Sequence, residues 1–182
     1  MVLAMAPLSV LATSSAESSP HRTGTGTSEY GLKAAFLYNF AKYTTWPKSA
    51  FSDKTAPIAV AIVGKDPFGK VLDQTIGGKK VGLRPFKIER ISDPAKVKTA
   101  HIVFLGSLKE RERKAFMDRL KGKPVLVVAD QKGLAGKGAL AGFYLDGGKV
   151  RFEISTKATK ANGLTISSQL LKLAKLVDSK RK

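Results

Sequence analysis

Two kinds of apolar pattern alternate along the chain. Three short runs are almost continuously apolar, which is typical of strands buried on both faces of a sheet. They lie at 58–63, 101–105 and 125–129. Helices are predicted at 32–43, 67–76 and 107–120, and further strands at 79–83 and 85–91. Strands that alternate with helices predict an α/β fold: a single three-layer domain in which helices flank a mixed, mostly parallel sheet.

Two of the predicted helices have a definable apolar face. In the helix at 107–120, the residues expected to face inward are Leu108, Ala115, Phe116 and Leu120. In the helix at 32–43, the face comprises Leu32, Ala35, Phe36, Asn39, Phe40 and Tyr43. A buried amide without a partner costs about 1–3 kcal/mol, so Asn39 is expected to have one. It either makes a structural hydrogen bond or helps to orient a ligand or the Glu153 carboxylate.

The segment at 148–155 has the alternating pattern of a half-buried strand. Phe152 and Ile154 share one side with Val150 and should face the core. Arg151 and Glu153 lie on the other side, which should face the solvent edge or a pocket. The alternative for Glu153 is structural: it pairs with a buried group such as Asn39 or a lysine, and its loss would then unfold the protein.

A polar residue follows this strand, and a helical pattern comes after it. Ser155 or Thr156 offers a side-chain oxygen that can cap a helix. Further along, small and apolar residues recur every three or four positions and predict one helical face. These residues are Leu164, Ser167, Ser168, Leu171 and Ala174, with Leu170, Leu173 and Val177 beside them.

Three stretches of the chain together resemble the YfiR-like family of bacterial periplasmic proteins. They are RFEIS at 151–155 with GLTISSQLLKLA at 163–174, LKAAFLYNFAKYTTWP at 32–47, and IVGKDPFG at 62–69. Their order and spacing agree with the family from about residue 30 to residue 177. We refer to 151–155 as the signature segment.

The resemblance implies a periplasmic regulatory protein that is not an enzyme. Relatives inhibit a membrane diguanylate cyclase by binding its periplasmic sensor domain, which lowers cyclic-di-GMP synthesis. The resemblance also implies a homodimer and a small-molecule pocket near the signature segment. The matching candidates for binding are Arg151, Phe152, Glu153 and Ile154; Ser155 stands where the family pattern usually has asparagine.

The N-terminal region has the composition of an export signal and a linker. Residues 1–16 carry no charge and end in small residues, which predicts a truncated secretory signal peptide; a disordered tail, or a start codon placed too far downstream, is the alternative. Residues 17–28 are rich in Ser, Thr and Gly and read as a flexible linker. The α/β domain is then expected at 29–178, followed by a basic tail at 179–182. Without cysteines, the chain cannot form the disulfides found in many relatives.

The net charge of +18 favours anionic partners and keeps two other interpretations open. One is a periplasmic carrier of an anionic or aromatic small molecule. The other is nucleic-acid binding, although no recognised motif for it is present and a true signal peptide would nearly exclude it. We therefore expect no nucleic-acid partner.

Motifs for catalysis are incomplete. The stretch at 64–70 has the glycine and lysine spacing of a phosphate-binding loop. However, Val71 replaces the hydroxyl that would bind Mg²⁺, and Pro67 lacks an N–H donor. Only His21 and His101 are available as imidazole ligands, which predicts no metal site and no cofactor.

Overall fold

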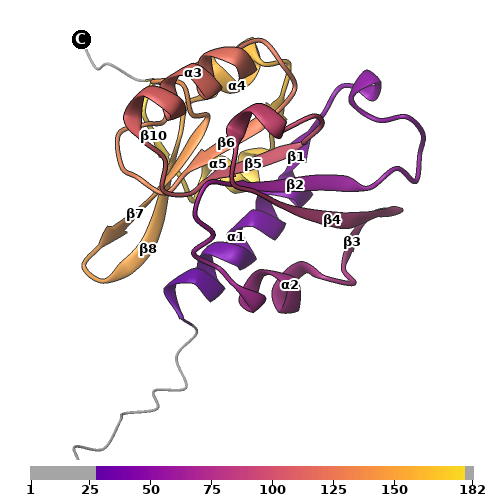
Figure 1. The fold of residues 1–182 in the computed structure, drawn as a ribbon, viewed down its shortest axis with the longest axis horizontal. Coiled ribbons are helices and arrows are strands. Elements are labelled where there is room, and N and C mark those ends of the chain that lie inside the picture. Colours follow the sequence, from indigo (N-terminus) through magenta and orange to yellow (C-terminus); the bar gives the residue numbers. More distant parts are fainter. Residues whose placement is uncertain (1–27, 179–182) are drawn as a thin grey trace, which may run out of the picture.

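The computed structural model describes residues 28–178 and is built on an eight-stranded mixed sheet (Figure 1). Its strands are β2 (Ile58–Val63), β3 (Lys80–Val81), β4 (Arg84–Ile91), β5 (Ile102–Leu105), β6 (Leu126–Ala129), β7 (Ala141–Asp146), β8 (Lys149–Ile154) and β10 (Lys175–Leu176). Their order is β10-β8-β7-β6-β5-β2-β4-β3, and only the β3–β4 and β7–β8 pairs are antiparallel. The predicted α/β class is confirmed. The predicted signal peptide, the linker except Ser28, and the basic tail lie outside the described residues.

Helices cover both faces of this sheet. They are α1 (Glu29–Tyr43), α2 (Lys70–Ile76), α3 (Glu110–Leu120), α4 (Thr156–Ala161) and α5 (Ser168–Leu171). Figure 1 shows α1 and α2 on one side of the sheet, and α3 on the other. The side chain of Ser28 caps α1 by accepting a hydrogen bond from the Gly31 N–H at 3.1 Å. Phe36 and Phe40 then pack α1 onto Phe152 of β8, with ring centroids 5.1 and 5.2 Å apart.

The chain reverses direction across the sheet beside β2. From β2 it passes through α2 and reaches β4 on one side, and then crosses to β5 on the other side. It continues outward from β5 through α3 to β6. In open α/β sheets, ligands bind outside the carboxyl ends of the strands at such a switch point. Strands β2, β5 and β6 are buried along their whole length, so packing in the core fixes the positions of their carboxyl ends.

The C-terminal segment does not form the predicted long helix. Residues Thr165–Ile166 (β9) pair with Thr44–Thr45 (β1), and β10 pairs with β8. Only the four residues of α5 lie in a helix between these strands. Gly163 lies in the left-handed region at φ +70°, which ends the preceding helix. The leucine spacing is typical of a helix, but backbone pairing with two separate sheets decides the conformation of this segment. The helix prediction is therefore wrong for most of its length.

Smaller differences concern the ends and faces of other helices. Helix α2 begins at Lys70 rather than at residue 67. Helix α3 begins at Glu110 rather than at residue 107, so Leu108 lies before it and is half-buried, whereas Phe116 and Leu120 are buried as predicted. Ala115 is exposed, however, and Met117 takes the inward position instead.

His101 is a structural residue. Its Nδ1 accepts a hydrogen bond from the Ala59 N–H at 3.0 Å, so Nε2 carries the proton and donates to the Ala50 carbonyl at 2.9 Å. The ring stacks on Phe51 at 4.2 Å. The imidazole therefore fastens the 48–57 segment to the sheet. Burial lowers the pKa of His101 below its ordinary value.

Candidate functional site

The signature segment lies in β8 and at the start of α4. Phe152 and Ile154 are buried in the core, as the alternating pattern predicts, and Arg151 is exposed. Glu153 was expected at a solvent edge or a pocket, but only 2% of it is exposed. Its Oε1 accepts a hydrogen bond from the Gly133 N–H at 2.5 Å. Because the 130–135 loop folds over this side of β8, Glu153 faces protein rather than solvent.

Ser155 is also buried and holds local structure. Its hydroxyl accepts from the Ala158 N–H at 3.0 Å, which confirms its predicted role as the cap of α4. The same hydroxyl donates to the Asp178 carboxylate. The polar side chains of Glu153 and Ser155 are therefore occupied within the fold, whereas Arg151 is presented outward.

The apolar face of α1 is offset from the predicted one. The buried residues are Gly31, Lys33, Ala34, Leu37, Phe40 and Ala41. Asn39 is half-buried, and its amide makes no hydrogen bond within residues 28–178, so the prediction of a buried, partnered amide is wrong. A charged residue, Lys33, occupies the core face instead, which the apolar pattern could not indicate.

Lys33 belongs to a compact polar cluster at the carboxyl end of β6. Its Nζ lies 2.5 Å from Oδ1 of Asp130 and also contacts the Glu29 carboxylate. The Tyr30 hydroxyl donates to the other oxygen of Asp130 at 2.9 Å. Burial acts to lower the pKa of Lys33, but hydrogen bonds with Asp130 and Glu29 outweigh it and raise that pKa. Burial and the bond to Asp130 raise the pKa of Tyr30.

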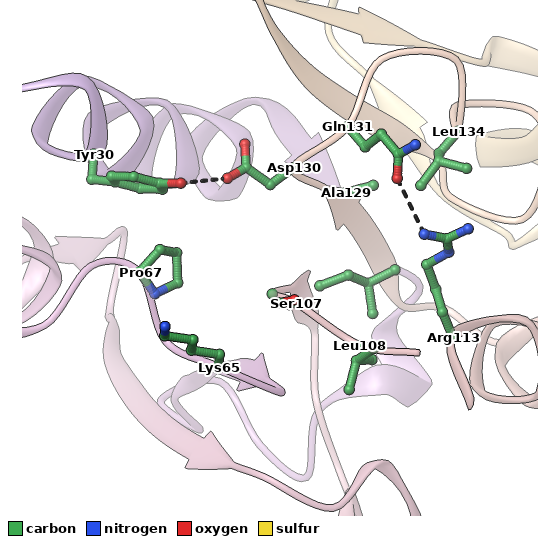
Figure 2. Close-up of a pocket in the computed structure, with 12 residues that line it drawn as sticks. Tyr30, Lys65, Pro67, Ser107, Leu108, Arg113, Ala129, Asp130, Gln131 and Leu134 are labelled. Atoms are coloured by element: carbon green, nitrogen blue, oxygen red, sulfur yellow. Dashed lines mark hydrogen bonds between the residues drawn. The ribbon is translucent and has the colours of Figure 1, made fainter. Parts of the chain in front are cut away.

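A cavity of about 440 Å³ opens beside this cluster, where β2, β5 and β6 end (Figure 2). We call it the switch-point cavity. It is lined by Tyr30, Lys65, Pro67, Leu105, Gly106, Ser107, Leu108, Arg113, Ala129, Asp130, Gln131 and Leu134. At Gly106, an added Cβ would lie 2.2 Å from the Lys65 carbonyl oxygen, so glycine is needed where these two strand exits approach.

Figure 2 shows Tyr30 and Lys65 toward one end of the cavity and Arg113 toward the other. The guanidinium of Arg113 donates from Nη1 to Oε1 of Gln131 at 3.1 Å. Its Nε is buried and has no hydrogen-bond partner among residues 28–178. Gln131 lies on the loop that Glu153 anchors through Gly133. The signature segment thus supports one wall of the cavity without lining it.

Sequence reasoning missed most of these residues, although a signal was present. Asp130 comes directly after a strand that was predicted to be buried and parallel, and Lys65 and Ser107 each come two residues after the end of such a strand. Carboxyl ends of parallel strands share one edge of a sheet, so the three positions could have been grouped from the strand predictions alone. Arg113 could not have been grouped with them from the sequence, because its position at the cavity depends on how α3 packs against the sheet. The 64–70 stretch forms a strand-to-helix turn, in which Asp66 accepts from the Phe68 N–H at 2.8 Å.

Comparison with known families identifies the chain. The described residues contain no cluster of three or more metal-binding side chains. None of the helices from residue 28 to 178 is long and apolar enough to cross a membrane. A family model described as YfiR/HmsC-like matches residues 30–175, which include the signature segment and the switch-point cavity. The chain therefore belongs to the YfiR/HmsC-like family of periplasmic regulators of diguanylate cyclases.

Proposed function

We propose that this protein is a non-enzymatic periplasmic inhibitor of a membrane diguanylate cyclase. It binds the periplasmic sensor domain of the cyclase and lowers cyclic-di-GMP synthesis. The observation that carries the proposal is the family match, which spans nearly all of the described chain. The buried positions of Glu153 and Ser155 support a role in holding the fold, and the exposure of Arg151 supports a role in contacting the partner.

A hollow beside Arg151 is the docking surface in this proposal. We call it the hairpin groove; it has a volume of about 580 Å³ and lies between the start of α1 and the β7–β8 hairpin. It is lined by Glu29, Leu32, Leu145, Gly148, Lys149, Val150 and Arg151. Leu145 is 51% exposed and Leu32 is 37% exposed. Exposed leucines beside basic side chains suit a partner surface that is apolar at its centre and acidic at its rim.

Binding at this surface regulates the cyclase only if it discriminates between two states of the enzyme. A ligand shifts a conformational equilibrium by the difference between its affinities for the two states. In the proposal, the inhibitor binds the inactive arrangement of the sensor domain more tightly and so increases the inactive population. The inhibitor itself needs no chemistry for this effect.

The proposal is tested by cyclic-di-GMP levels in cells that lack the protein. Wild-type protein supplied in trans should lower the level. Leu145→Asp, which places a charge on an exposed apolar residue of the groove, should lose that effect. Leu83→Asp is the matched control, because Leu83 is similarly exposed, at 67%, and lies in the β3–β4 turn outside the hairpin groove. Full repression by both variants would exclude this surface, and failure of wild-type protein to repress would contradict the function.

Light scattering of the purified wild-type protein and of both variants measures their oligomeric state, and it tests whether a second copy of this chain occupies the groove. If Leu145→Asp converts a dimer into a monomer while Leu83→Asp does not, a second copy of this chain occupies the groove instead of the cyclase.

A further inference from the structure

We infer that the switch-point cavity binds a small organic carboxylate. Its carboxylate is held by Arg113, and its apolar body lies against the leucines that line the cavity. The cavity stands at the carboxyl ends of β2, β5 and β6, beside the point where the chain reverses direction across the sheet. Open α/β sheets bind ligands at this place because the loops there diverge and leave a crevice.

The charges around the cavity favour an anion. Lys65 and Arg113 both line it, and neither has a carboxylate oxygen within 4.0 Å among the described residues. The one carboxylate that lines the cavity, Asp130, is already paired with Lys33. Two cations without an ion-pair partner therefore line the cavity, against the single carboxylate of Asp130, which shares Lys33 with Glu29.

Arg113 is the direct partner in this assignment. Its Nε is buried without a hydrogen bond, which is costly for a polar group that has lost its water. One Nη already donates to Gln131, so the guanidinium is oriented while part of its donor capacity is unused. A planar carboxylate matches the fork of donors on a guanidinium and would accept from the Nη N–H groups that the bond to Gln131 leaves unused. Lys65 is exposed and adds attraction from the opposite end.

The remaining lining favours a carboxylate with an apolar body over inorganic phosphate. Leu105, Leu108 and Leu134 line the cavity, and the volume of about 440 Å³ is in the range of small-molecule sites. Phosphate sites commonly use several backbone N–H groups at the start of a helix. Here Pro67 lines the cavity and has no N–H to donate.

The cavity is separate from the hairpin groove, with which it shares no lining residue. Ligand binding can therefore be tested without the cyclase. A failure of this inference leaves the proposed regulation of the cyclase standing.

Calorimetry with the purified protein at constant ionic strength tests the inference, with hexanoate, acetate and inorganic phosphate as probes. Hexanoate should bind saturably and at least tenfold more tightly than acetate, because its added methylenes are buried. Arg113→Gln should weaken hexanoate binding at least tenfold, and Lys65→Gln severalfold. Lys114→Gln is the matched control, since it removes one exposed charge from the same helix outside the cavity, and it should change affinity less than twofold.

Three results would overturn the inference: no saturable hexanoate binding, tighter binding of phosphate than of hexanoate, or equal loss in all three variants. Equal loss would mean that net charge alone attracts the anion. Thermal unfolding of each variant checks that it is folded. If Arg113→Gln does not fold, the comparison of Lys65→Gln with Lys114→Gln still tests the inference, because both change exposed side chains and only Lys65 lines the cavity. Amide chemical-shift changes at Gly106 and Gln131 on adding hexanoate should place the ligand in the cavity.

Discussion

The switch-point cavity and the hairpin groove use polar residues in opposite ways. The cavity is walled by segments that leave buried parallel strands, and its Asp130 is tied to Lys33 inside the protein. The groove lies between the start of α1 and an antiparallel hairpin, and exposed leucines and basic side chains line it. Glu153 and Arg151 are two residues apart in β8, yet the first braces a loop of the cavity and the second is exposed at the groove. Substitutions of the buried polar residues beside the cavity, Lys33 and Glu153, should therefore cost stability, whereas substitutions of exposed residues in the groove should cost only recognition.

The largest effect is expected in the core that supports both regions. Phe152→Ala removes a ring that packs on Phe36 and Phe40, and it should lower the free energy of unfolding by about 3–5 kcal/mol. Phe152→Leu, which keeps most of the volume, should cost less than half as much. Urea denaturation measures both. Equal losses, or a loss below about 1 kcal/mol for alanine, would place Phe152 outside the main core.

Breaking the polar cluster beside the cavity should have the next largest effect. Lys33→Met leaves the Asp130 carboxylate without its cation in a partly buried site, which should cost about 3 kcal/mol. Adding Asp130→Asn removes the unpaired charge, so the double variant should recover a substantial part of that loss. If the double variant is as unstable as the sum of the two single variants, the ion pair is not the source of the effect.

Loss of the buried carboxylate of Glu153 should loosen one wall of the cavity. Glu153→Ala removes the acceptor of the Gly133 N–H, which should cost about 1–3 kcal/mol. Glu153→Gln retains an amide oxygen and should cost less. Hydrogen exchange at the Gly133 amide should accelerate in the alanine variant. Unchanged exchange there would remove Glu153 from its bracing role.

Acidification should weaken the attachment of the 48–57 segment. The folded protein disfavours protonation of His101, whereas the unfolded chain binds that proton near the ordinary pKa of about 6.5. The free energy of unfolding should therefore fall as pH decreases from 7.5 to 5.5, toward the lowered pKa of the folded state. Replacing the imidazole in His101→Gln should reduce the slope of stability against pH. An unchanged slope in this variant would assign the pH dependence to other groups.

The sequence predicts elements well where the local pattern and the tertiary structure agree. The strands at 58–63 and 125–129 are buried on both faces, so their apolar runs are sufficient. Residues 164–177 have a helical spacing, but pairing with β1 and β8 draws parts of them into strands. The burial of Lys33 could not be predicted from the local pattern, because its charge is paired with Asp130, which lies 97 residues further along the chain. The cavity depends on such distant pairings, so it could be located from strand order but not from any local motif.

The smallest effect on stability, and the most direct test of the proposed regulation, is expected at Arg151. Arg151→Ala should leave the free energy of unfolding within about 0.5 kcal/mol of wild type, because the side chain is exposed. The decisive measurement is calorimetric titration of the purified protein with the isolated periplasmic domain of the cyclase. The proposal predicts saturable binding by wild-type protein and at least tenfold weaker binding by Arg151→Ala. Absence of binding by the folded wild-type protein would contradict direct inhibition, and equal binding by the two proteins would remove Arg151 from the interface.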